Sequence, residues 1–195
     1  MSDRSAVISR NTSETDIELE LDLDGRGEVD VATGLGFFDH MLDALGRHAR
    51  FDLRLRCDGD LEVDDHHTVE DCAIALGSAI DETLGERRGI ARFGYAYAPL
   101  DEALARVVVD LSGRPASVVD LGLRREMIGE VACENLHHVF VTLANRARAA
   151  IHVDVLRGDN DHHRAEAAFK ALALALRQAV ERDGTEAVPS TKGVL

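Results

Sequence analysis

Two histidine pairs, each followed by a glutamate, are the groups in this sequence best suited to binding a metal ion. They read His66-His67-x-x-Glu70 and His162-His163-x-x-Glu166. The second copy lies 162 − 66 = 96 residues after the first. Residues three and four apart share a helix face, so each glutamate can aim at the same point as a histidine of its pair. Imidazole and carboxylate ligands together suit Mn, Fe, Co or Zn, so the two copies predict a duplicated metal site.

A further histidine precedes each pair. His40 and His138 both stand in apolar stretches and each precedes a leucine by five residues. By contrast, His48 and His152 fall outside the doubled pattern and are interpreted as ordinary positions. The doubled pattern gives eight candidate ligands, four for each of two metals: His40, His66, His67, Glu70, His138, His162, His163 and Glu166.

Adjacent histidines on a helix cannot easily serve the same ion. The helix turns about 100° per residue, so the two imidazoles of each pair point in different directions. They could bind two neighbouring ions or take part in two different sites. Ligands from one chain could therefore complete a site on another, which makes oligomerisation part of the metal-site hypothesis.

Composition limits the possible class of protein. A chain of 195 residues with 45% hydrophobic residues is long enough for one compact domain with a core. A formal net charge of −14 argues against nucleic acid or an anionic membrane as the main partner. No apolar stretch is long enough to span a membrane, and no secretory signal is visible. Three widely spaced cysteines suit a reducing compartment, so we expect a cytoplasmic protein.

The pairs must be positioned by elements that the hydrophobic pattern predicts. Alternating residues predict a strand over 17–23, a tight turn at Asp24-Gly25 into a second strand near 28–33, and another strand over 51–57. Apolar residues at helical spacing predict a helix over 37–47 and another that begins near His66, with Asp64 or Asp65 as its cap.

The second part of the chain repeats this order. Strands are predicted over 91–98, 103–111, 117–123 and 150–156, with helices over 134–148 and 161–181. We therefore predict an α+β fold, with two similar β-β-α-β-α halves from an internal duplication packed into one layered domain. That domain spans residues 1–195, and the repeats cover approximately 1–90 and 91–195.

One apparent motif is better explained by a turn. Asp22-Leu23-Asp24-Gly25 after an apolar strand resembles the start of haloacid-dehalogenase-type phosphatases. However, Arg26 stands where those enzymes usually have a small residue, and no separate core domain follows. The hairpin interpretation is therefore favoured.

Six ordered pieces of the chain carry a family resemblance. They are Arg10-x-Thr12-x-Glu14-Thr15, Gly34-Leu35-Gly36-Phe37-Phe38-Asp39-His40-Met41, Asp65-His66-His67-Thr68-Val69-Glu70-Asp71, Glu134-Asn135-Leu136-His137-His138, Asp161-His162-His163-x-x-Glu166-Ala167-x-Phe169-Lys170 and Pro189-Ser190-Thr191-Lys192-Gly193. In this order they resemble imidazoleglycerol-phosphate dehydratase of histidine biosynthesis. The expected form is the single-function one, without the phosphatase domain fused to it in some bacteria.

The resemblance implies a lyase that dehydrates D-erythro-imidazole glycerol phosphate to imidazole acetol phosphate. The hydrogen lost from carbon is not adjacent to a carbonyl and so is not acidic. The resemblance implies two Mn²⁺ ions per active site, which hold the substrate ring between them as an imidazolate. The ions act as Lewis acids and so make loss of this hydrogen possible.

The resemblance also implies roles for individual residues. The eight candidate ligands match the family's metal ligands, while His137 fits a packed helix position as well as it fits a ligand. Glu14 matches the carboxylate that shuttles protons at the reacting carbons, a role that suits a tuned carboxyl group. The residues that match its phosphate-binding groups are Arg92, Arg114, Lys170, Ser190 and Lys192. Among them, only Lys170 has a placement that spacing itself supports, four residues after Glu166 on one helix face.

The family's assembly is a homo-oligomer of about 24 subunits built from trimers, with active sites between subunits, and closed symmetry of this kind is common. Two other functions could use the same ligands. A dinuclear metallohydrolase would activate water with them, whereas a metal-storage protein would need no catalytic base. Replacing Glu14 by glutamine separates these functions, because only the dehydratase should lose turnover while it keeps its metal.

Overall fold

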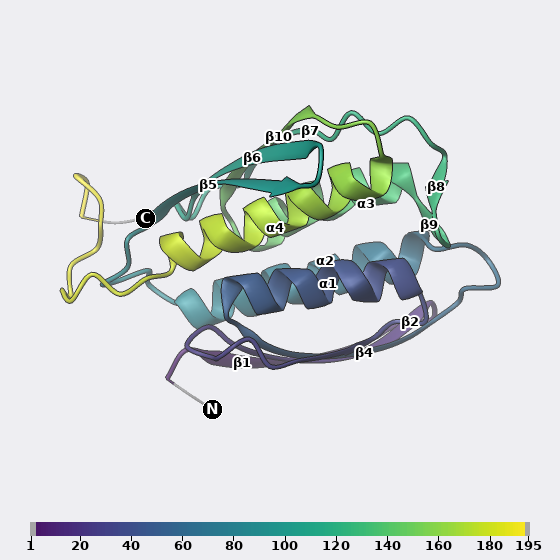
Figure 1. Cartoon of the computed structure of the whole chain (residues 1–195). Coiled ribbons are helices and arrows are strands. Elements are labelled where there is room, and N and C mark those ends of the chain that lie inside the picture. Colours follow the sequence, from purple (N-terminus) through teal and green to yellow (C-terminus); the bar gives the residue numbers. More distant parts are fainter. Residues whose placement is uncertain (1–2, 194–195) are drawn as a thin grey trace.

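Four helices lie between two four-stranded sheets in the computed structural model, which describes residues 3–193 (Figure 1). One sheet and two helices come from the N-terminal half of the chain, and the other sheet and two helices come from the C-terminal half. The predicted α+β class with two similar halves is confirmed. The predicted domain limits, Met1 and Leu195, lie outside the described residues.

The N-terminal half consists of four strands and two helices. Their bounds are β1 Ser5–Asn11, β2 Thr15–Asp22, β3 Val29–Ala32, α1 Gly36–Ala49, β4 Asp52–Gly59 and α2 His66–Leu84. The sheet order is β1-β2-β4-β3, in which β3 runs parallel to β4 and the other neighbours are antiparallel. Alternation decides which face is covered: Ile17 and Leu19 of β2 are buried under the helices, and Glu18 faces outward.

The C-terminal half repeats this sheet. Its main elements are β5 Phe93–Leu100, β6 Ala103–Asp110, β7 Ala116–Asp120, α3 Cys133–Arg146, β10 Ala150–Arg157 and α4 Asp161–Ala179. The order β5-β6-β10-β7 matches the first sheet strand for strand, including the parallel pair β7 and β10. Two short strands, β8 Met127–Ile128 and β9 Val131–Ala132, form an extra hairpin before α3.

The predicted β-β-α-β-α order lacks one strand, because each half has three main strands before its first helix. In the N-terminal half the missed strand is β1. Its neighbours Val7 and Ile8 put apolar side chains on both faces, and Val7 is 52% exposed, so the alternation is weak.

The predicted hairpin at Asp24-Gly25 is wrong. Strand β2 pairs with β1 and β4, and β3 lies at the opposite edge of the sheet beside β4. The chain instead passes around the start of β4, where Asp52 holds it. One carboxylate oxygen of Asp52 accepts hydrogen bonds from three consecutive backbone N–H groups, those of residues 26–28.

The helices join the two halves in crossed pairs. Helix α1 packs on α4, and α2 packs on α3. The approach of α2 to α3 is close at Gly77, where a Cβ would lie 2.6 Å from the Cβ of Arg146. Within residues 3–193, no helix is long and apolar enough to cross a membrane. Because α2 and α4 carry the histidine pairs while α1 and α3 carry His40 and His138, this pairing decides which candidate ligands lie close together.

Candidate functional site

Both histidine pairs lie in the first turn of a helix whose start is capped two residues earlier. The Asp64 carboxylate accepts from the His66 backbone N–H at 2.8 Å, and the Asn160 side chain accepts from that of His162 at 2.9 Å. Of the two caps considered for α2, Asp64 therefore acts at His66. The Asp65 carboxylate accepts from a backbone N–H of β9 instead. The same type of cap therefore places both histidine pairs in the first turn of their helices.

The first group of possible metal ligands, here called the Glu70 cluster, consists of His66, Glu70 and His138. His138 Nε2 lies 3.0 Å from Glu70 Oε1, and His66 Nε2 lies 3.6 Å from Glu70 Oε2. The two imidazole rings stack with centroids 5.6 Å apart. The hydrogen bond from His138 is the largest influence on Glu70 and lowers the pKa of its carboxyl group. Helix α2 supplies two members and α3 the third, so both halves of the chain contribute.

The second group, the Glu166 cluster, consists of His40, His162 and Glu166. The Nε2 atoms of His40 and His162 lie 3.0 and 3.2 Å from Glu166 Oε2. Lys170 Nζ lies 2.5 Å from the other carboxylate oxygen. Burial opposes the charge on Glu166, but Lys170 and His40 outweigh it and lower the pKa of Glu166 to about 2. Helices α1 and α4 supply this cluster, so it mirrors the first.

Each cluster has the donor set that a divalent ion needs. Within residues 3–193, these are the two groups in which three such ligand atoms lie within 4.8 Å of one another. Ligand bonds of about 2.0–2.2 Å allow one ion to lie between atoms spaced in this way. The four imidazoles have 36–47% of their side-chain surface exposed, which leaves coordination positions open. Two imidazole nitrogens with one carboxylate fit Mn²⁺ as well as other borderline ions.

The second histidine of each pair belongs to neither cluster. The His67 ring lies nearly perpendicular to that of His66, and the His163 ring is perpendicular to that of His162, with interplanar angles of 74° and 90°. The expectation that paired histidines point in different directions is therefore confirmed.

Carboxylates that the sequence did not point to orient both of these rings. Asp60 lies 3.0 Å from His67 Nδ1, and Glu102 lies 2.8 Å from His163 Nδ1. Each carboxylate raises the pKa of its histidine. The pKa of Glu102 itself falls to about 2, because His163 and the backbone N–H groups of residues 160 and 159 donate to it. Since Nδ1 faces a carboxylate in both rings, Nε2 is the nitrogen left to bind a metal.

The first histidine of each pair is supported in two different ways. Asn135 Oδ1 lies 3.0 Å from His66 Nδ1. At the matching position of the other half, three residues before His40, Phe37 packs its ring at 5.1 Å from that of His162. The sequence resemblance included both residues but assigned them no role. Their partners lie on another helix, so chain spacing carries no signal for these contacts.

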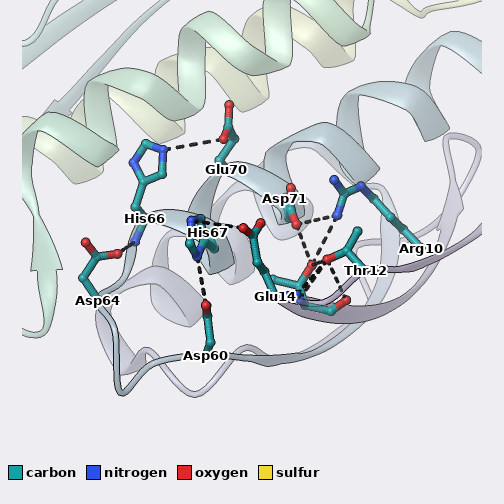
Figure 2. A network of polar contacts seen from close by, with 10 residues as sticks. Arg10, Thr12, Glu14, Asp60, Asp64, His66, His67, Glu70 and Asp71 are labelled. Atoms are coloured by element: carbon teal, nitrogen blue, oxygen red, sulfur yellow. Dashed lines mark hydrogen bonds and ion pairs between the residues drawn. The ribbon is translucent and has the colours of Figure 1, made fainter.

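Glu14 lies beside the Glu70 cluster, in the turn between β1 and β2. Its Oε1 is 3.7 Å from His67 Nε2, and 48% of its side chain is exposed (Figure 2). In the turn between β5 and β6, Asp101 lies 3.9 Å from His163 Nε2. In both halves, a carboxylate therefore lies near Nε2 of the second histidine of the pair.

The predicted phosphate-binding residues are divided between two places. Lys170 pairs with Glu166, whereas Arg92 donates to Asp110 and to the backbone oxygen of Pro189. The backbone N–H of Arg92 also bonds to Ala179 at the end of α4, 17 residues beyond His162, which is about 26 Å along the helix. Ser190 and Lys192 follow in the same tail, and Arg114 lies in the loop before β7. Within one chain, most of the predicted phosphate-binding residues therefore lie far from the Glu70 and Glu166 clusters.

His137 does not occupy the packed helix position that was one of its two interpretations. Its side chain is exposed on α3, and it belongs to neither metal cluster. It lines a surface hollow beside β7 with Cys133 and Glu134. The next residue, His138, points to Glu70 instead.

Comparisons with known proteins agree on one family. A family model described as imidazoleglycerol-phosphate dehydratase matches residues 33–176. A relative of that name from Phytophthora nicotianae is 59% identical over 192 residues, which covers 98% of this chain but 42% of the relative. The chain thus spans about two fifths of that longer protein. The relative of that name from Kluyveromyces lactis is 50% identical over 216 residues, and the alignment covers 99% of this chain and 98% of the relative.

Solved structures match the fold over most of its length. The imidazoleglycerol-phosphate dehydratase of Staphylococcus aureus superposes with a TM-score of 0.83 at 34% identity, covering 91% of this chain and 99% of the other. The structure of IGPD from Pyrococcus furiosus in complex with (S)-C348 gives the same TM-score, 0.83, at 40% identity, covering 96% and 100%.

Proposed function

Because this chain belongs to the imidazoleglycerol-phosphate dehydratase family, we propose that its Glu70 and Glu166 clusters bind the two metal ions of an active site. The chain is a hydro-lyase of histidine biosynthesis. Its substrate is D-erythro-imidazole glycerol phosphate, and its product is imidazole acetol phosphate. The observation that carries the proposal is the pair of equivalent clusters, each built from both halves of the chain. A substrate ring with two nitrogens matches two equivalent metal sites.

Mn²⁺ is the metal we propose, because the family resemblance implies it and the donor set accommodates it among other borderline ions. When bound, two Mn²⁺ ions would supply Lewis acidity that stabilises the substrate ring as an imidazolate. The residues of the chain do the rest. The clusters hold the ring in place, and His67 and His163 offer Nε2 atoms that Asp60 and Glu102 keep oriented outward.

Glu14 is the group that moves protons at the reacting carbons. Its carboxylate is half exposed and lies beside Nε2 of His67, one of the proposed metal ligands. The backbone around it is fixed, because the Glu14 carbonyl accepts from the Asp60 N–H at 3.1 Å and the Glu14 N–H donates to Thr12 Oγ1 at 3.1 Å. A fixed backbone with an exposed carboxylate suits a group that exchanges protons with a bound substrate.

The active site forms between copies of the chain. The Arg92 end of α4 lies about 26 Å from His162, whereas a three-carbon chain links the substrate's ring to its phosphate. One substrate molecule therefore cannot reach both places in a single chain. Its ring would lie at the clusters of one copy, and its phosphate would be bound by the residues of another copy: Arg92, Arg114, Ser190 and Lys192. The outward nitrogens of His67 and His163 are likewise free to complete a neighbour's metal site. Both features support a homo-oligomer, and a 24-mer built from trimers is the assembly we propose.

The outer face of the second sheet also supports association with another copy. The register places Tyr95, Val108, His152 and Val118 in one row across β5, β6, β10 and β7. Tyr95 and Val118 are 67% and 55% exposed, and an exposed apolar patch of this kind is typical of an interface. The equivalent face of the first sheet carries ion pairs such as Glu20–Arg54 and Asp30–Arg56 instead.

We place the enzyme in the cytoplasm as one domain made of repeats that cover roughly residues 1–90 and 91–195. The three cysteines are all free, which fits a reducing compartment. The matching sheet orders and the 96-residue offset of the histidine pairs support the repeat boundaries.

Product formation tests the function directly. Mn²⁺-loaded protein should convert imidazole glycerol phosphate to imidazole acetol phosphate without releasing inorganic phosphate. The Glu14→Gln variant should lower turnover by about 10²–10⁴-fold, because the moving proton loses its carrier. Bound metal per chain should not change. Glu18→Gln, an exposed carboxylate on the same strand as Thr15, is the matched control and should keep full activity.

The other outcomes favour other functions. Phosphate release without dehydration would indicate a metallohydrolase, and metal binding with neither reaction would indicate a storage protein. Full dehydration by the Glu14→Gln variant would remove Glu14 from the mechanism.

A further inference from the structure

Asp71 is a buried carboxylate that neither metal cluster uses. It follows Glu70 on α2 and is 5% exposed. Its Oδ2 accepts a hydrogen bond from Thr15 Oγ1 at 2.5 Å and forms an ion pair with Arg10. Arg10 also donates to Thr15 Oγ1 at 3.2 Å. Figure 2 shows this network beside Glu14, on the side away from His66. A buried carboxylate with two strand partners therefore ties β1 and β2 to the ligand-bearing helix.

The network reaches the backbone of Glu14 through the turn. Thr12 Oγ1 accepts from the N–H groups of Glu14 and Thr15 at 3.1 and 3.0 Å, and the Thr12 N–H donates to the Thr15 carbonyl at 2.9 Å. Thr15, which is 3% exposed, is thus both the first residue of β2 after the turn and the residue held by Asp71. Fixing Thr15 fixes the point from which the Glu14 side chain projects.

The second half of the chain does not repeat this network. The position equivalent to Asp71 is 71 + 96 = 167, where Ala167 is fully buried. The turn between β5 and β6 is held differently, since Glu102 accepts from the backbone N–H groups of residues 159 and 160. The metal ligands are duplicated, whereas the Asp71 network occurs, within residues 3–193, only in the half that carries Glu14.

We propose that Asp71, acting through Thr15 and Arg10, is the positioning residue that holds Glu14 against the metal-binding helix. The inference rests on the proposed role of Glu14 and adds the hydrogen-bond network that determines the position of its side chain. Asp71 touches no substrate. Its effect is on the fraction of time in which the Glu14 carboxylate occupies a position from which it can exchange a proton with the substrate.

Two variants test this role. Asp71→Asn keeps the shape but removes the charge, and Thr15→Val removes the hydroxyl while it keeps the volume. Each should lower kcat by about 10–100-fold and change KM by less than about twofold, because substrate binding is retained while proton transfer is misplaced. Bound metal per chain should equal that of the wild type. Thr15→Ser, which keeps the hydroxyl, should recover most of the lost kcat.

A double-mutant cycle separates positioning from general stability. In the Glu14→Gln background, Thr15→Val should cause no further loss in the residual turnover, because the group it positions is already gone. Glu20→Gln, which breaks an exposed pair on the same strand, is the control and should leave kcat unchanged in both backgrounds.

Three results would overturn the inference. They are additive losses in the Glu14→Gln background, an unchanged kcat in Thr15→Val, and a loss of metal in proportion to the loss of activity. If Asp71→Asn fails to fold, the Thr15 variants still decide the question. Failure of the wild type to dehydrate the substrate would instead reject the proposed function, and so the two failures are distinct.

Discussion

Each glutamate of the two clusters is arranged to be ionised before a metal arrives. His138 lowers the pKa of Glu70, while Lys170 and His40 bring that of Glu166 to about 2. The two carboxylates nevertheless differ in availability. Both oxygens of Glu70 face imidazoles, whereas one oxygen of Glu166 is occupied by Lys170. The clusters therefore share a design but offer unequal numbers of carboxylate oxygens to a metal.

Asn135 should set the affinity of one cluster without affecting the other. It accepts from His66 Nδ1 and so leaves Nε2 as the ligand nitrogen. Asn135→Leu should weaken metal binding at the Glu70 cluster by about 10–100-fold, because it removes the partner that orients the ring. A two-site metal titration by calorimetry measures this. Phe37→Leu, at the equivalent position beside His162, is the control and should affect the Glu166 cluster instead.

The members of the two clusters could be predicted as candidate ligands from sequence, but the residues that support them could not. Spacing alone put His66 and Glu70 on one face, and the repeat pointed to His138. The partners Asp60 and Glu102 lie in a loop and a turn, and Glu102 is 61 residues from the histidine it orients. Such contacts arise from tertiary packing, so no local sequence pattern predicts them.

At the scale of elements, the pairing of helices across the two halves is the feature that builds the clusters. Hydrophobic periodicity predicted all four helices and most strands. It could not predict which sheet neighbours β2 would take, because a strand's own pattern identifies its buried face and not its partners. The same limit explains the incorrect hairpin at Asp24-Gly25. Residues in that loop instead contact the opposite half of the chain.

Asp24 joins the two halves at the end of the molecule remote from the clusters. It pairs with Arg4 before β1 and with Arg182 after α4, and Arg4 is the main cause of its lowered pKa. A lowered pKa means that the pair stabilises the fold above about pH 4 and loses this effect as pH falls through the lowered value. Asp24→Asn should therefore reduce the unfolding free energy by about 0.5–1 kcal/mol at pH 7.

Denaturant unfolding at two pH values measures this effect. The difference between wild type and Asp24→Asn should shrink as the pH approaches 3, because protonated Asp24 resembles asparagine. A difference that stays constant between pH 7 and pH 3 would mean that the ion pairs of Asp24 do not contribute to stability.

At the scale of the whole molecule, one chain holds both clusters of candidate metal ligands but separates them from most of the predicted phosphate-binding residues. If neighbouring chains supply ligands as proposed, metal removal should loosen the proposed assembly, because metal binding is linked to the associated state. Light scattering after chelation should show a smaller mass, and re-addition of Mn²⁺ should restore the original one. His67→Ala should show the smaller mass even with metal present. An unchanged mass in chelator would place all ligands within one chain.

The most direct measurement is an anomalous-difference map of Mn²⁺-loaded crystals with a substrate analogue, recorded on both sides of the manganese absorption edge. We expect two peaks per chain, one in the Glu70 cluster and one in the Glu166 cluster, at about 2.0–2.3 Å from the ligand atoms. The analogue's ring should lie between two such ions, with His67 or His163 of another copy among the ligands. Peaks that avoid the two clusters, or an analogue bound without contact to either ion, would contradict the proposed active site.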